Sequence, residues 1–249
     1  MEKKQQIVMM LCVIYGIWHL ATQWTSTLIS FLQWDTKTVM TIVQLGYIQS
    51  FGSFCNAIGA FFFGQLIDST GPKTIFIVST VLTSLYYMGL SFARDFYSFF
   101  FLQLLRFGYH FDAAAEMYLA TATTERERTQ ALMTLNVPQA VALFFGPLIA
   151  AKIAISTTLR TSQMLSGVFV LFTVAPMVWW LLPNTHSVPR LASARLRPQE
   201  YWPMVTRNSA LREALLLRAL IVGPYVAFEL ISRQFLMRAY AQGPYDTAL

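Results

Sequence analysis

The chain has 249 residues, of which 55% are hydrophobic and only 12% charged, and its formal net charge is +6. Soluble domains carry roughly a quarter charged residues, so this chain lacks the charge that a water-exposed surface needs. The positive balance argues weakly for nucleic-acid binding, because the basic residues lie in short loops between apolar runs, where membrane topology explains them better. Cys12 and Cys55 lie inside apolar runs, which argues against a disulfide framework or a zinc site.

Apolar runs of roughly 18 to 25 residues recur along the chain, and each has the length of a transmembrane helix. Barrel strands are excluded because they run only ~10 residues with strict polar–apolar alternation. The first run is too long for a signal peptide, so we expect a retained helix. The sequence predicts an all-α membrane protein that crosses the bilayer at least six times. In chain order the runs are Ile7–Ser30, Val39–Phe63, Ile75–Phe92, Phe96–Leu119, Ala131–Ala151, Met164–Leu182 and the weaker Ala214–Ile231.

The basic residues predict the orientation, because cytoplasmic loops of membrane proteins are enriched in Lys and Arg. With a cytoplasmic amino terminus, ten basic residues fall on that side and four on the other, over the first six runs. We therefore expect the amino terminus in the cytoplasm. The ten are Lys3, Lys4, Lys73, Arg126, Arg128, Arg190, Arg195, Arg197, Arg207 and Arg212. The four are Lys37, Arg94, Lys152 and Arg160.

The runs divide the chain into three predicted parts. Residues 1–182 form a six-helix amino-terminal bundle, 183–213 a basic cytoplasmic linker, and 214–249 a seventh helix and tail. The linker is rich in Pro and Arg and carries Tyr201 and Trp202 in its second half. We expect it to end in an interfacial helix; a basic lipid-binding patch is the alternative.

The fourth run contains four ionisable residues, Arg106, His110, Asp112 and Glu116. Such groups cost at least ~2.5 kcal/mol each at membrane depth, so they normally face a protein interior or a water-filled cavity. On a regular helix they would fall within an arc of about 160°. One interpretation is mutual neutralisation that lets the helix pack. The other is a polar wall of a transport pathway, in which a carboxylate or His110 carries a proton.

The first run places His19 near mid-membrane, with Gln23 one turn later. A single histidine there is compatible with a hydrogen-bonded core residue or with the lining of a cavity. The third and sixth runs carry no charged residue or histidine. This contrast suggests a three-plus-three repeat, in which the first and fourth helices face the centre and the third and sixth face lipid.

The loop between the second and third runs carries a specific pattern, Gly64-Gln-Leu66-Ile-Asp68-Ser-Thr-Gly71-Pro-Lys73. Gly64 suits close helix approach, Gly71 a tight turn, and Asp68 can accept hydrogen bonds from helix-terminal amides. The pattern resembles the signature loop of the major facilitator superfamily, Gly-x-Leu-x-Asp-(Arg/Lys)-x-Gly-x-(Arg/Lys)-(Arg/Lys). Ser69 and Thr74 replace basic residues of that signature, which would weaken its charge network.

Further elements support the resemblance. Phe145-Gly146-Pro147 and the residues up to Ala151 are similar to the Gly-Pro-x-x-Gly-Gly element of proton-coupled antiporters, with alanines at the last two glycines. The Glu125–Arg128 loop is similar to the acidic–arginine loop after the fourth span of these proteins. Arg106 with Gly108 matches their span-four arginine motif only weakly. Within the superfamily, residues 45–151 most resemble organic cation transporter-like solute carriers and bacterial tetracycline antiporters.

The resemblance implies a twelve-helix fold that transports a small organic solute, with an organic cation as one candidate, by alternating access coupled to protons. His19, Gln23, Arg106, His110, Asp112 and Glu116 would line the pathway. This chain would supply the first half and one further helix, and the second half, or a second copy of the chain, would complete it. Among a piece of a longer product, a truncated isoform and a pairing half-transporter, we expect the first, because Ala248-Leu249 shows no polar tail.

An alternative function is a truncated, non-transporting membrane scaffold or regulatory subunit. An enzyme is not expected, because the chain contains no His-Glu-x-x-His and no Gly-x-Ser-x-Gly element. The acidic residues of the fourth run have no further histidines arranged with them as a metal site requires. We expect no cofactor, no metal and no nucleic-acid partner, and a multi-pass position in the lipid bilayer.

Overall fold

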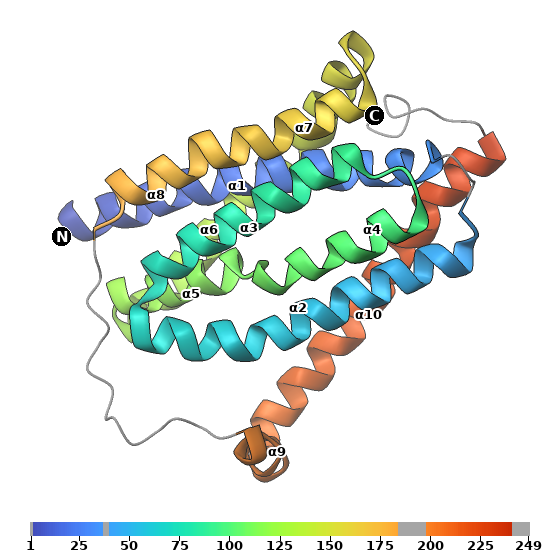
Figure 1. The fold of residues 1–249 in the computed structure, drawn as a ribbon. Helices are drawn as coiled ribbons and strands as arrows, with labels where there is room; N and C mark the ends of the chain where they lie inside the picture. The colour runs from blue at the N-terminus through green and yellow to red at the C-terminus, as the bar shows by residue number, and fades with distance from the viewer. Residues whose placement is uncertain (1, 37–39, 184–197, 241–249) are drawn as a thin grey trace. The chain divides into compact units, whose positions relative to one another are not determined.

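A computed structural model describes residues 2–36, 40–183 and 198–240, which are helical apart from short connections. The chain forms two compact units, a large unit with the helices α1 to α8 and a small unit with α9 and α10. Figure 1 shows the helices of the large unit running alongside one another. No strand occurs in the described ranges, and the prediction of an all-α fold is confirmed.

Among the residues searched, five helical stretches are long and apolar enough to cross a membrane. Each contains most of a predicted run, and polar or aromatic residues extend several of them, as at Trp34 and Ser156. Multiple spans of this kind make the chain a multi-pass membrane protein. The stretches are Gln5–Trp34 in α1 (Glu2–Trp34), Val43–Ile67 in α2 (Ile42–Thr70), Pro72–Phe92 (α3), Arg126–Ser156 in α6 (Glu125–Ser156) and Leu159–Leu181.

The fourth apolar run is divided, so the prediction of one regular helix there is wrong. It consists of α4 (Phe96–Leu102), a 3-10 helix (Gln103–Gly108) and α5 (Phe111–Ala122), with Tyr109 and His110 outside any helix. Figure 1 shows α4 and α5 end to end with irregular chain between them.

Neighbouring helices pack closely around the break. A Cβ on Gly108 would collide with Leu82 of α3, and one on Gly59 of α2 would collide with the carbonyl of Phe107. Neighbouring helices therefore touch the backbone on both sides of the break. The amide of Tyr109 bonds the carbonyl of Arg106 three residues back, instead of four as in an α-helix.

The sixth run also departs from a regular helix. It consists of α7 (Leu159–Phe169), a π-helical turn (Val170–Val174) and α8 (Ala175–Leu181). Pro176 has no amide hydrogen and cannot continue the regular hydrogen-bond ladder, which accounts for a wider turn just before it. The hydroxyl of Thr173 donates to the carbonyl of Phe169 in the same turn.

The third run does not face lipid as predicted. In its most apolar window, 56% of α3 is buried, against 22% of α6 and 28% of the α7–α8 stretch. The buried side of α3 includes hydroxyl residues, among them Ser84, whose Oγ donates to the carbonyl of Gly167 at 2.8 Å. Small hydroxyl residues allow close helix packing in membranes, so α3 occupies the interior of the large unit.

Helices α1 and α6 approach each other closely at two glycines. A Cβ on Gly146 of α6 would lie 2.5 Å from Cβ of Gln23 and 3.1 Å from the carbonyl oxygen of Leu20. A Cβ on Gly16 of α1 would lie 2.8 Å from Cβ of Pro138. Glycine at these positions lets the two helices pack tightly, and α6 remains one helix although it contains Pro138 and Pro147.

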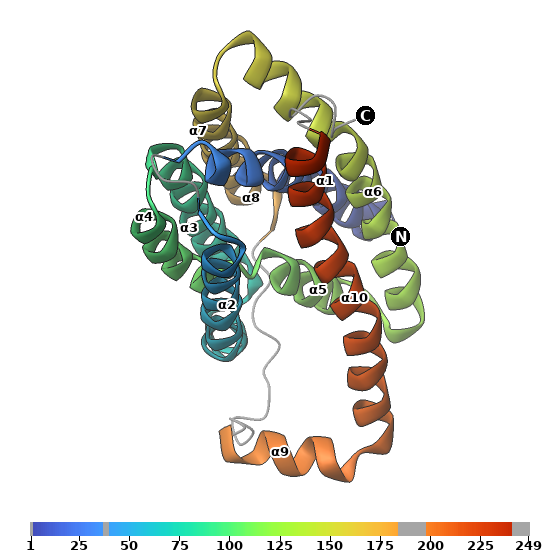
Figure 2. The same ribbon diagram turned by 90° about the vertical axis from the view of Figure 1, so that its right-hand side faces the viewer.

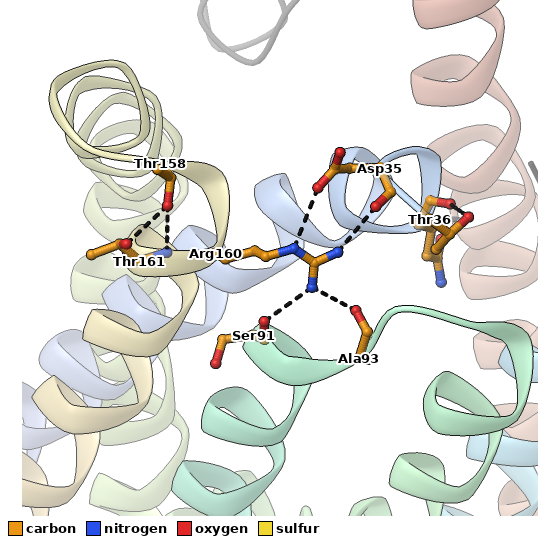
Figure 3. A network of polar contacts seen from close by, with 8 residues as sticks. Asp35, Thr36, Ser91, Ala93, Thr158, Arg160 and Thr161 are labelled. Carbon is orange, nitrogen blue, oxygen red and sulfur yellow. Dashed lines mark hydrogen bonds and ion pairs between the residues drawn. The ribbon is translucent and has the colours of Figure 1, made fainter. Parts of the chain in front are cut away.

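Arg160, in the first turn of α7, joins the ends of three helices (Figure 3). Its Nη1 donates to the carbonyls of Ser91 (3.0 Å) and Ala93 (2.6 Å) at the end of α3. Its Nη2 donates to the carbonyl of Asp35, just after α1, at 3.0 Å, and its Nε lies 3.3 Å from the Asp35 carboxylate. A guanidinium suits this place because helix carboxyl ends carry unpaired carbonyls and negative partial charge.

The small unit consists of α9 (Pro198–Arg207) and α10 (Ser209–Tyr240), which meet at a sharp corner (Figure 2). The side chain of Asn208 accepts a hydrogen bond from the amide of Leu211 and begins α10. The predicted seventh run lies inside α10, and its insertion in the membrane stays a prediction. Much of the predicted linker, residues 184–197, lies outside the described residues.

Candidate functional site

The signature loop forms a tight connection between α2 and α3. Gly71 has φ 86° and ψ 160°, a conformation that favours glycine, as the sequence predicts. Gly64 does not serve close packing within the described chain, because a Cβ there would meet nothing within 4 Å. Leu66 is exposed, and the side chain of Asp68 lies outside the description.

Lys73 connects this loop to the end of the sixth run. Its Nζ donates to the carbonyl of Trp179 at 2.9 Å and to that of Leu182 at 2.7 Å. The same ammonium lies 5.9 Å from the centroid of the Trp179 ring. A lysine at a helix carboxyl end satisfies carbonyls that the helix leaves unpaired. The loop therefore holds α8 in place.

Of the pathway residues predicted in the fourth run, Arg106 and His110 lie against α2. Nη1 of Arg106 lies 3.4 Å from Oε1 of Gln49 and 3.5 Å from Oε1 of Gln103, so amide oxygens are its acceptors. His110 is buried, with its ring tilted against Phe63 at a centroid distance of 5.1 Å. Its Nε2 has no hydrogen-bond partner among the residues that the structure describes.

Asp112 lies on a different side, against α1. Nε2 of His19 is 3.1 Å from Oδ1 of Asp112, and a proton on Nε2 makes this a charge-assisted hydrogen bond. The His19 side chain is only 6% exposed, whereas that of Asp112 is 48% exposed. The ring also packs edge-on against Tyr15 at 4.3 Å. The His19 ring is thus buried in the protein, whereas the Asp112 carboxylate is accessible from outside the bundle.

The remaining pathway residues do not join this pair. Glu116 is exposed on α5, one turn after Asp112, and Gln23 is half-buried on α1 next to Gly146. The predicted common arc of about 160° is therefore wrong, because the break before Phe111 rotates the two halves of the run. Mutual neutralisation within the run is not seen either: in the described structure no ion pair joins Arg106 to a carboxylate.

Three hydroxyl groups beside the pair escaped the sequence analysis. The Tyr87 hydroxyl lies 3.2 Å from the Tyr109 hydroxyl and 3.2 Å from Oγ1 of Thr22. The Tyr109 hydroxyl is also 3.2 Å from Oγ1 of Thr22. They come from α3, the break and α1, so only the fold brings them together. Of the three, only Thr22 could have been linked to His19 from the sequence, because residues three apart lie on the same face of a helix.

Aromatic packing fixes the break against α1. The Trp18 ring stacks on the Phe111 ring with centroids 4.1 Å apart and planes 8° apart. Trp18 also packs against Tyr109 at 5.7 Å. Asp112 therefore lies next to this aromatic contact in the first turn of α5, where amide groups favour a negative charge.

Nothing in the described side chains indicates a metal site, since no group of three or more His, Cys, Asp or Glu residues is suitably close. Residues 7–241 match the family model of the Major Facilitator Superfamily. The chain is also similar to the MFS-type transporter pytF of Aspergillus terreus, with 38% identity over 65 residues. That stretch covers 26% of this chain and 22% of the relative, so the chain spans less than a quarter of the relative's length.

Proposed function

Because the chain belongs to the Major Facilitator Superfamily, we propose that it transports a small organic solute by alternating access coupled to protons. The observation that carries the proposal is the contact between His19 of α1 and the half-exposed Asp112 of α5. An ionisable pair inside a membrane protein is costly, so a role in moving charge is its best explanation.

The geometry suggests how the pair would work. With Asp112 ionised, His19 donates to it and holds α1 against α5. A proton on Asp112, or a cationic solute beside it, removes the charge that His19 binds. The contact between the helices then weakens, which favours a second arrangement of the bundle. The irregular chain at Tyr109 and His110 interrupts the helix before α5, so α5 can change its angle to α4 without breaking a continuous helix.

A single copy of this chain would offer only one wall of a pathway in this proposal. We propose that a second half, from a longer chain or from a second copy, supplies the other wall. The amino terminus is cytoplasmic in this proposal, which places the signature loop and its Lys73 contact on the cytoplasmic side. The resemblance to the solute carrier family 22 member 18 type (organic cation transporter-like protein 2) and to tetracycline antiporters favours an organic cation and proton exchange.

Uptake into proteoliposomes under an imposed pH gradient tests the proposal. The chain is reconstituted alone and with its second half, and ethidium serves as a fluorescent organic cation. We expect uptake that follows the gradient and disappears in the Asp112→Asn/Glu116→Gln variant. Asp95→Asn is the matched control, because it removes a carboxylate at the start of α4 yet keeps a residue that can cap the helix.

Equal uptake by the wild type and the double variant would exclude these carboxylates from coupling. A chain that never supports uptake, but that crosslinks to a stable partner without solute-dependent protection, would instead be a scaffold or a regulatory subunit.

A further inference from the structure

A π-helical turn, Val170–Val174, lies between α7 and α8 in the sixth run. The two helices otherwise follow one another along a single line (Figure 1). A π-helix bonds each amide to the carbonyl five residues back, so its turn holds about one residue more than an α-helical turn. Pro176 favours this wide turn but does not require it, because α6 is one α-helix with two prolines inside. An α-helical form of the same segment is therefore open to the chain.

The helix before the turn, α7, is held to α1 and α3 by buried side chains. Nε2 of Gln163 donates to Oγ1 of Thr25 in α1 at 3.2 Å and to the carbonyl of Tyr87 in α3 at 3.1 Å. Oγ of Ser84 in α3 donates to the carbonyl of Gly167 at 2.8 Å. A Cβ on Gly167 would lie 2.9 Å from the Ser84 carbonyl oxygen, so the two backbones touch. Because a shift of α7 would leave these buried polar groups unpaired, we expect α7 to keep its position.

The helix after the turn, α8, is held at its carboxyl end. The ammonium of Lys73 donates to the carbonyls of Trp179 and Leu182. The hydroxyl of Tyr118 in α5 donates to the carbonyl of Pro183 at 3.2 Å. These acceptors are carbonyls at the end of a helix, where the last turn has no partner within the helix itself. Donors from two other elements thus fix the end of α8.

The sequence of α8 also fits a second register. Conversion of the π turn to an α-helical turn would advance each residue of α8 by one position, about 1.5 Å along the axis and about 100° around it. Val178 and Leu182 are buried, at 0% and 1% exposure. After the advance, Met177 and Leu181 would take their places. Each buried position would again hold an apolar side chain, so the packing permits both registers.

The contacts at the end of α8 distinguish the two registers. In the advanced register, the carbonyls of Trp179, Leu182 and Pro183 would lie one residue beyond their present donors. The bonds from Lys73 and Tyr118 to these carbonyls would then break. The two donors therefore stabilise the π register, whereas the contacts of α7 are the same in both.

We propose that the π turn is a register switch, through which α8 changes between the present π register and an α-helical register while α7 stays in place. Lys73 and Tyr118 select the π register. Because Lys73 belongs to the signature loop, a rearrangement of that loop would rotate α8. Single π turns within α-helices are frequent at functional sites. The switch goes beyond the proposed function and does not depend on the solute.

Distances between two spin labels on the full chain in lipid nanodiscs test the switch. Cys12 and Cys55 are first replaced by alanine, so that only introduced cysteines carry labels. One pair joins Leu85 of α3 to Trp180 of α8, and the control pair joins Leu85 to Met164 of α7; all three side chains are exposed. A rotation of about 100° carries a side chain most of the way across a helix about 10 Å wide, so the α8 pair should shift by several ångströms.

Lys73→Met should favour the advanced register. We expect a second distance in the α8 pair, with a share raised about tenfold, as expected for the loss of hydrogen bonds from a charged group. The control pair should keep its single distance. Tyr118→Phe should have the same effect to a smaller extent, because its hydroxyl makes a neutral hydrogen bond.

Deletion of Phe172 should remove the switch. Its side chain is 72% exposed, and the deletion leaves Val170 and Val174 three residues apart, on one face of an α-helix. The regular helix then holds α8 in its present place, so the second distance should disappear even with Lys73→Met. Deletion of Leu165, also exposed, is the matched control. It lies in regular helix, displaces Gly167 from Ser84, and should destabilise the protein.

Four results would overturn the proposal. They are a single distance in the α8 pair of Lys73→Met, an equal change in both pairs, a second distance that persists after the deletion of Phe172, and a loss of stability from that deletion as large as from the deletion of Leu165. None of these measurements requires uptake. A register change in a chain that transports nothing would therefore support the switch and contradict only the proposed function.

Discussion

The side chains of Arg160 and Asp112 are both charged and both link separate helices, yet their surroundings differ. Arg160 makes four contacts at the ends of α1 and α3, and its side chain is 22% exposed. Asp112 contacts His19 and interacts with the Tyr15 hydroxyl, and its side chain is 48% exposed. A guanidinium that is held by several carbonyls at helix ends is occupied by the protein, whereas a half-exposed carboxylate can exchange a side-chain partner for a proton or a cation.

The comparison teaches that charge in a membrane helix does not by itself mark function. Arg160 satisfies the carbonyls of helix ends and so stabilises the bundle. Asp112 lies beside the break in the fourth run. The Trp18 ring stacks on neighbouring Phe111, while the Asp112 carboxylate stays half-exposed. We therefore propose that the first region contributes to stability and the second to transport.

The largest expected effect is on transport. Asp112→Asn should lower uptake driven by a pH gradient by about a hundredfold or more, the range seen when a proton-carrying group is removed. Thermal stability should change little, within about 0.5 kcal/mol, because the side chain is half-exposed. Uptake assays and thermal unfolding of the same preparation measure both quantities. A large loss of stability would show that Asp112, like Arg160, mainly stabilises the helix bundle.

The next effect is on packing between α1 and α6. Gly146→Ala should destabilise the protein by about 1–3 kcal/mol, because its Cβ would lie 2.5 Å from Cβ of Gln23. Gly64→Ala is the matched control: it meets open space and should leave stability unchanged or slightly raised. Denaturation in detergent micelles measures the difference. Equal stability of the two variants would contradict the close approach at Gly146.

A smaller effect is expected from Arg160. Arg160→Ala removes charge-assisted hydrogen bonds that are partly screened by solvent, at a cost of about 1–2 kcal/mol. Arg160→Lys should recover only part of the lost stability, since an ammonium group cannot make all of the contacts to Asp35, Ser91 and Ala93. Unfolding measurements give both costs. Uptake per folded molecule should be unchanged. A loss of uptake without a matching loss of stability would mean that Arg160 takes part in transport.

The smallest effect concerns the hydroxyl cluster beside the pair. Tyr109→Phe removes contacts with Thr22 and Tyr87 and should cost about 1 kcal/mol of stability. The stacking of Trp18 on Phe111 does not depend on that hydroxyl. Thermal unfolding and uptake at several pH values check this variant. An effect on uptake as large as that of Asp112→Asn would extend the site to the cluster.

The sequence alone predicted the features that depend on local composition. Long apolar runs must be helical in lipid because the backbone has no other hydrogen-bond partners, and five such stretches are present in the residues searched. Gly71 was predicted from the turn it permits, and its φ of 86° agrees. The superfamily resemblance of the loop is confirmed by the match over residues 7–241.

The features that depend on contacts between distant segments could not be predicted. The fourth run contains no proline, and its break lies where Leu82 of α3 and Gly59 of α2 approach the backbone closely. Lys73 was recognised as a signature residue, but its carbonyl acceptors lie more than a hundred residues away. His19 and Asp112 were singled out separately, and their pairing follows from how the break orients α5 against α1.

The most direct test of the account is a double-mutant cycle on uptake driven by a pH gradient, with His19→Gln, Asp112→Asn and the combined variant. If the two residues act as one unit, the combined variant should transport no worse than Asp112→Asn alone, with a coupling energy of about 1 kcal/mol or more. Losses that simply multiply would mean that His19 and Asp112 act independently, and would contradict the account.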